Sequence, residues 1–175
     1  MLTEPLPNTL DVRKAAARGV SISGALKPVD LPRFMALLAN DTGEIMAGLA
    51  FSRDEENRAV IAVNFEAKIS VICQRCLQAM PLSMTGDNSL GVVLTDEQAK
   101  HLPRHLDALI VPEESCNLWE LVEDELILAL PPFSYHDTED CKQILSEYTG
   151  PGPEEGEGDQ KPNPFDVLAQ LKTDK

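Results

Sequence analysis

Apolar and mostly polar side chains alternate from Val60 to Ile72, and this alternation is the feature that most limits the fold. Successive side chains of a strand project to opposite faces, so a period of two predicts a strand with one buried face and one solvated face. The chain must therefore contain a sheet that is covered on one side. The apolar positions are Ile61, Val63, Phe65, Ala67, Ile69 and Val71.

Three neighbouring segments show related patterns. Residues 20–26 and 44–51 alternate in the same way, and residues 81–94 continue the alternation after a short turn. The connections are too short to hold crossover helices, so an antiparallel β-meander is expected. The in-phase apolar residues are Ile45, Ala47, Leu49 and Phe51 in the first long strand, and Leu82, Met84, Leu90, Val92 and Leu94 in the last.

Segments with helical signals occur before and after the long strands in the sequence. Asp11 can cap a short helix that ends at Arg18, and Asp30 can cap a helix from Leu31 to Ala39. The strongest helix signal covers residues 117–130, where Asn117 is the predicted N-cap and Glu120 completes a capping box. Its apolar stripe is Leu118, Leu121, Val122, Leu126 and Ala129, with Glu123 and Asp124 expected to face away from it.

The fold class predicted from these elements is α+β, an antiparallel β-meander packed with a few helices. Residues 1–146 would form a single core domain. Residues 147–162 are rich in Gly, Pro and acidic residues and predict a flexible acidic linker, because they cannot bury enough apolar surface to offset the entropy of ordering.

A short amphipathic helix is predicted at residues 163–175. Asn163 would be the N-cap and Pro164 the first helical residue, and an apolar stripe would present Phe165, Leu168 and Leu171. A helix on a tether is typical of a segment that docks in a partner's groove. The alternative is that it packs against the chain's own sheet.

Four residues form a candidate metal site. Cys73 and Cys76 have Cys-x₂-Cys spacing at the predicted hairpin tip, and His136 and Cys141 follow the strongest helix. These ligand types and local spacings fit a structural zinc. The Cys pair alone also fits two thiols packed in a turn. Cys116 precedes the helix and is left out of the site.

Charge limits the classes of partner. The net charge is −14, and residues 113–159 hold fourteen acidic residues and one basic residue. Nucleic-acid binders neutralise phosphates with Lys and Arg, so we expect at most weak direct RNA binding. A basic protein is the better match, although solubility alone also explains the charge. The basic residues available for RNA are Arg13, Lys14, Arg18, Lys27 and Arg33.

Other features exclude further classes. The first seven residues lack a basic region and an apolar stretch, so no signal peptide is expected, and the chain lacks an apolar run of the ~20 residues that a membrane helix needs. The expected location is the cytoplasm, where cysteines stay reduced. No phosphate loop, dinucleotide motif or nucleophile elbow appears, so we predict no small-molecule substrate. His101 and His105 are expected to be solvated.

Several of these motifs together resemble the YceD family, whose members are described as large ribosomal RNA subunit accumulation proteins. The resemblance rests on Cys73 to Cys76, on residues 122–131, on His136 with Cys141, and on residues 163–172, in that order along the chain. It implies a bacterial cytoplasmic protein needed for normal accumulation of large-subunit ribosomal RNA, with no established catalytic activity.

Two hypotheses remain open at this stage. One is a non-catalytic factor that engages ribosomal or rRNA-processing proteins through its acidic surface and tail. The alternative is a metal-dependent RNA-processing hydrolase. Four protein ligands would leave no position on a zinc ion for water, and an acidic chain repels RNA. The hypothesis of a non-catalytic factor is therefore favoured.

Overall fold

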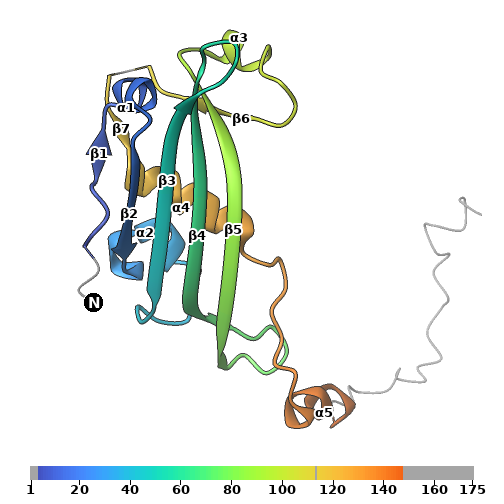
Figure 1. Ribbon diagram of the computed structural model, residues 1–175. Helices are drawn as coiled ribbons and strands as arrows, with labels where there is room; N and C mark the ends of the chain where they lie inside the picture. The colour runs from blue at the N-terminus through green and yellow to red at the C-terminus, as the bar shows by residue number, and fades with distance from the viewer. Residues whose placement is uncertain (1–3, 113, 148–175) are drawn as a thin grey trace, which may run out of the picture.

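The computed structural model describes residues 4–112 and 114–147, and its centre is a five-stranded sheet (Figure 1). The strand order is β2-β3-β4-β5-β6, and the first four strands form the predicted antiparallel meander. The α+β class is therefore confirmed. The strand bounds are β2 Ser21–Leu26, β3 Glu44–Arg53, β4 Ala59–Ile72, β5 Ala79–Val93 and β6 Asp107–Ile110.

The predicted alternation of buried and exposed residues in β4 is confirmed. Its odd-numbered residues from Ile61 to Val71 are all buried, whereas Asn64, Glu66 and Lys68 are exposed. The odd-numbered residues of β3 from Ile45 to Phe51 share the buried face, because register pairs Ile45 with Ala67 and Leu49 with Val63. One face of the sheet thus supplies half of the hydrophobic core.

β6 departs from the predicted meander, because it pairs parallel to β5. A parallel neighbour needs a crossover of about a dozen residues, and residues 94–106, which include the short helix α3 (Asp96–Ala99), provide it. The prediction for Leu94 was wrong as well. The pairing of β5 with β4 ends at Gly91, and Leu94 lies beyond β5 with 45% of its surface exposed, while Val93 is buried.

The helices cover the buried face of the sheet. α4 (Leu118–Ala129) crosses behind the strands (Figure 1). Its predicted stripe residues Leu118, Leu121, Val122 and Leu126 are buried, but Ala129, the fifth, is exposed. Asn117 is its N-cap, as predicted, and accepts hydrogen bonds from the Trp119 and Glu120 amides. α1 (Val12–Arg18) packs against β3 and β4, with Asp11 as the predicted N-cap. The short strands β1 (Thr9–Leu10) and β7 (Cys116–Asn117) pair with each other.

Two predictions about the region of α2 were wrong. The expected helix 31–39 is only α2 (Pro32–Met35), with Leu31 at the N-cap, because Asp30 instead accepts the Lys27 amide in a preceding 3₁₀ turn, Pro28–Asp30. Glu123 does not face solvent either: it is 2% exposed.

Glu123 is buried because it caps α2 from a distance. Its Oε1 accepts the backbone amides of Arg33 and Phe34 at 2.7 and 3.0 Å, and its Oε2 pairs with the Arg33 guanidinium at 2.8 Å. The first amides of a helix lack intrahelical acceptors, and a carboxylate there also meets the positive end of the helix dipole. These contacts lower the pKa of Glu123, although burial alone raises it.

The predicted linker, apart from residue 147, and the whole tail helix lie outside the described residues, and both stay predictions. Within the described residues, no helix is long and apolar enough to cross a membrane.

Candidate metal centre

The turn between β4 and β5 presents the first two candidate ligands. The Cys73 amide donates to the Gln78 carbonyl and the Leu77 amide donates to the Cys73 carbonyl, both at 2.9 Å. Leu77 has a φ of 59°, in the left-handed region, which lets the chain reverse within these few residues. Cys73 and Cys76 therefore lie at the hairpin tip, as predicted from the strand patterns on either side of them.

The segment after α4 supplies the other two ligands. Pro131 and Pro132 end the helix, and the chain then runs to the hairpin tip, where the Ser134 carbonyl accepts the Gln74 amide at 2.9 Å. His136 follows, and Cys141 lies in the first turn of α5 (Glu139–Glu147). In Figure 1, α5 lies beside the β4–β5 turn, far from α1 and α3 at the other end of the sheet.

The four predicted residues come together. Their ligand atoms all lie within 4.8 Å of one another. Cys73 Sγ is 3.6 Å from Cys141 Sγ, and Cys76 Sγ is 3.3 Å from His136 Nδ1. Around a tetrahedral zinc with Zn–S of about 2.3 Å, two sulfurs are separated by roughly 3.8 Å. The donor set and its spacing therefore fit a single metal ion.

The thiols differ in their electrostatic surroundings. Burial alone raises the pKa of Cys73, but backbone N–H groups of Cys76, His136 and Arg75 donate to its sulfur, and the net effect lowers that pKa to about 5. Burial and the neighbouring Cys73 and Cys76 sulfurs raise the pKa of Cys141. A cysteine that binds a metal must lose its proton. The lowered pKa of Cys73 favours its thiolate form, whereas the raised pKa of Cys141 means that a nearby cation is needed to favour the thiolate.

Two neighbours of the cluster were missed from the sequence. The guanidinium of Arg75 lies 5.0 Å from the centre of the Tyr135 ring, with its Nη1 3.9 Å from Cys141 Sγ. α5 was missed as well. Its signal was Thr138 followed by Glu139 and Asp140, a cap residue before an acidic first turn.

Other candidate residues lie apart from this cluster. Cys116 is buried in β7 opposite Leu10, as expected for a cysteine outside the site. His101 and His105 are exposed, as predicted. Of the basic residues considered for RNA, two are occupied by carboxylates, because Lys14 pairs with Asp11 and Arg33 pairs with Glu123 and Asp124.

The fold and site define an α+β protein built on one five-stranded sheet, with a Cys₃His cluster at the tip of its longest hairpin. Residues 61–172 match a family described as "Large ribosomal RNA subunit accumulation protein YceD". A protein of Haemophilus influenzae with the same description is 32% identical over 169 residues, which cover 95% of this chain and 96% of that protein. The chain belongs to the YceD family. No solved structure matches it.

Proposed function

We propose that this protein is a non-catalytic factor that supports the accumulation of large-subunit ribosomal RNA in the cytoplasm through ribosomal or rRNA-processing proteins. The family description and that of the Haemophilus relative supply the pathway. The Cys₃His cluster is the observation that carries the non-catalytic part of the proposal.

The cluster suits a structural zinc held by Cys73, Cys76, His136 and Cys141. A catalytic zinc keeps one position for water, whereas four protein ligands complete the tetrahedron. Cys73 and Cys141 are almost fully buried, at 0% and 4% exposure, which leaves little access for a substrate. A hydrolytic role at this cluster is therefore disfavoured.

A zinc here would join two parts of the chain that are distant in sequence. It would fix residues 131–147 against the β4–β5 turn and so set where the tail leaves the core. Large apolar side chains are exposed along this part of the surface, with Leu128 at 78%, Phe133 at 66% and Tyr135 at 45%. They offer contact area to a partner. The proposed tail helix would add the docking residues Asn163, Pro164, Phe165, Leu168 and Leu171.

The charge distribution favours protein partners over RNA. The chain carries −14, and ion pairs already occupy Lys14 and Arg33. Ribosomal proteins that bind phosphate backbones are basic, and their charge complements this surface. The isolated protein should therefore bind precursor RNA weakly and without sequence preference.

The experiment uses cells that lack the protein and express the full chain, a Phe165→Ala/Leu168→Ala/Leu171→Ala variant, or a Cys141→Ser variant. Cys116→Ser is the matched cysteine control. We expect the tail variant to fold normally, keep its zinc, lose its captured ribosomal or processing proteins and fail to restore large-subunit RNA. Full rescue by the tail variant would contradict docking through the tail. Folded wild-type protein with only trace zinc would contradict the structural zinc.

A further inference from the structure

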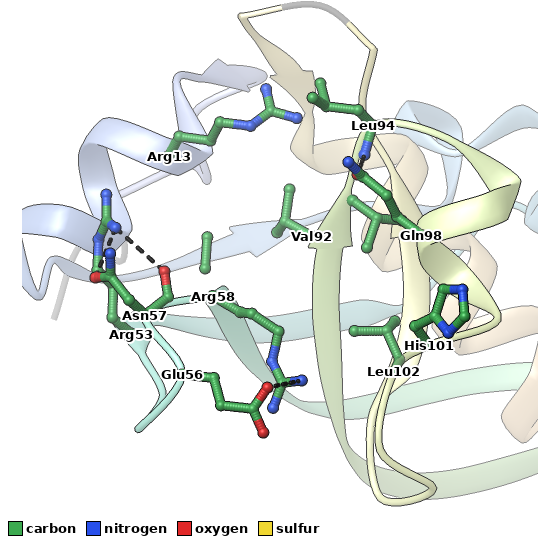
Figure 2. A pocket seen from close by; sticks show the side chains of 12 residues that line it. Arg13, Arg53, Glu56, Asn57, Arg58, Val92, Leu94, Gln98, His101 and Leu102 are labelled. Atoms are coloured by element: carbon green, nitrogen blue, oxygen red, sulfur yellow. Dashed lines mark hydrogen bonds and ion pairs between the residues drawn. The ribbon is translucent and has the colours of Figure 1, made fainter.

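A cavity of about 490 Å³ lies at the end of the sheet opposite the Cys₃His cluster (Figures 1 and 2). Three parts of the chain enclose it. α1 contributes Arg13, the end of β3 and the turn after it contribute Arg53 and Arg58, and the end of β5 with the following segment contributes Val92 and Leu102. Its size is within the ~300–1,000 Å³ of typical small-molecule sites.

Three guanidinium groups line this cavity in a protein whose net charge is −14. Arg58 is held by carboxylates, with Asp54 at 2.6 Å and Glu56 at 2.9 Å. Arg53 differs: within the described part of the chain its contacts are the neutral backbone and side-chain oxygens of Asn57, at 3.2 and 2.8 Å. Arg53 therefore forms no salt bridge within the described residues, although Asp54, Glu55 and Glu56 follow it directly in the chain.

The rest of the cavity is suited to a flat, partly apolar group. Val92 and Leu102 form an aliphatic wall between the arginines and His101 (Figure 2). Two amide side chains beside it have fixed orientations. Asn57 Oδ1 accepts from Arg53, and Gln98 Oε1 accepts the Leu94 amide at 2.8 Å. Each is thereby oriented with its NH₂ group as a donor, which can recognise the carbonyl or ring-nitrogen edge of a heterocycle.

We propose that this cavity binds a nucleoside phosphate. The base would lie on Val92 and Leu102, and the phosphate would bind to Arg53. Arg13 would add only to the positive potential beside it, because its Nη2 already donates to the Val111 carbonyl at 2.6 Å. Guanidinium groups bind phosphate through paired, charge-assisted hydrogen bonds, which match this anion in geometry as well as in charge.

A compact anion fits this setting better than a long nucleic acid. The basic residues of the cavity are local, and Glu56 lies at its edge. Flanking phosphates of a polymer would meet the acidic surface, whereas a single phosphate group would not. The expected ligand is therefore a free nucleotide rather than an RNA strand. The proposal rests neither on zinc nor on the tail, so it can fail without affecting the proposed function.

Calorimetric titration of the full chain tests this directly. The probes are GMP and AMP, the matching nucleosides, inorganic phosphate, an RNA decamer with and without a 5′-phosphate, and an acidic peptide. We expect a mononucleotide to bind at least about tenfold more tightly than its nucleoside or inorganic phosphate, since a charge-assisted contact and a stacked base each contribute ~1.4 kcal/mol or more. Tighter binding of the free nucleotide than of either decamer would support the proposal, and tighter binding of the 5′-phosphorylated decamer would overturn the choice of a free nucleotide.

Two variants make the result specific to the cavity. Arg53 and Arg104 are both exposed arginines, but only Arg53 lines the cavity. Arg53→Gln should weaken mononucleotide binding about tenfold or more, and Arg104→Gln should change it by less than about twofold. The proposal is overturned if no nucleotide binds, if both variants weaken binding equally, or if inorganic phosphate or the acidic peptide binds as tightly as the nucleotide.

Discussion

The two turns that flank β4 are built in different ways. In the Asp54–Arg58 turn, one Asp54 oxygen accepts the amides of Glu56 and Arg58 at 3.0 and 2.9 Å, so the turn is stabilised by its own residues. In the Cys73–Gln78 turn, the Gln74 amide is satisfied by Ser134, and Cys73 Sγ lies 3.6 Å from Cys141 Sγ. The first turn is closed by its own residues, whereas the second has local hydrogen bonds and also relies on a segment about sixty residues further along the chain.

The largest expected effect follows from this dependence. If the cluster holds the proposed zinc, a chelator should release the Cys73–Gln78 turn and α5, because the ligands on the two segments would no longer share an ion. If free zinc normally exceeds its Kd a thousandfold, the unfolding free energy should fall by about 4 kcal/mol. Hydrogen exchange at the Gln74 and Leu77 amides should accelerate, while that at Glu56 and Arg58 stays unchanged.

Cys141→Ser should reproduce the effect of the chelator, and Cys116→Ser should not release zinc. Cys116 lies in β7 and contacts the Asn117 carbonyl rather than the cluster. Equal exchange at both turns after zinc removal would show that the contrast between them is wrong.

The contact of Glu123 with the start of α2 offers a second test of a long-range interaction. Glu123→Gln removes the charge that holds the Arg33 and Phe34 amides, and it should cost about 1.5–3 kcal/mol at neutral pH, the range for one hydrogen bond to a charged group. The folded pKa of Glu123 is lowered, so its contribution is present above the unfolded value of ~4.3 and is lost as pH falls through the folded value. Unfolding in denaturant between pH 7 and pH 3 should show the two proteins converging. A constant difference would contradict this role.

Glu123 also shows where prediction from sequence stops. Local rules located Asn117, the start of α4 and the alternation of β4, because helix caps and strand periods are properties of neighbouring residues. The Cys₃His set was found because its ligands occur as two local pairs. Glu123 lies in a charged run, and its partner amides are about ninety residues away. Sequence spacing carries no sign of that contact.

β6 and the cavity lined by Arg13 and Arg53 were missed for the same reason. Residues 107–110 have no clear period, and they form a strand only because the edge of β5 accepts them. Arg13 and Arg53 are forty residues apart in sequence, and the fold brings them to one cavity. Such surfaces can be predicted only after the topology is known.

Asp54→Ala tests the locally stabilised turn. It removes acceptors for the Glu56 and Arg58 amides and the pair with the Arg58 guanidinium at 2.6 Å, and the expected cost is about 1–2 kcal/mol. The loss should be the same with and without zinc, because no contact of Asp54 reaches the cluster. Urea unfolding of both forms measures it. A cost that depends on zinc would mean that the two turns are coupled through β4.

The smallest expected effect compares the residue with positive φ in each turn. Leu77 has a φ of 59° and is 74% exposed, so it bears the steric cost of the left-handed region without burying its side chain. That cost is ~1–2 kcal/mol for most residues, and glycine avoids it while losing more chain entropy on folding. Leu77→Gly should therefore stabilise the protein by about 0.5–1 kcal/mol, a rise of ~2–4 °C or less in Tm.

Asn57 is the matched control, with a φ of 64° in the turn at the other end of β4. Asparagine tolerates this conformation, and Asn57 Oδ1 also accepts from Arg53 at 2.8 Å. Asn57→Gly relieves little backbone strain and removes that hydrogen bond, so the Tm should stay the same or fall slightly. If Leu77→Gly lowers Tm in the zinc-loaded protein, the leucine side chain has a stabilising contact that outweighs its strain. The Cys73–Gln78 turn would then be less dependent on distant residues than the contrast with Asp54–Arg58 implies.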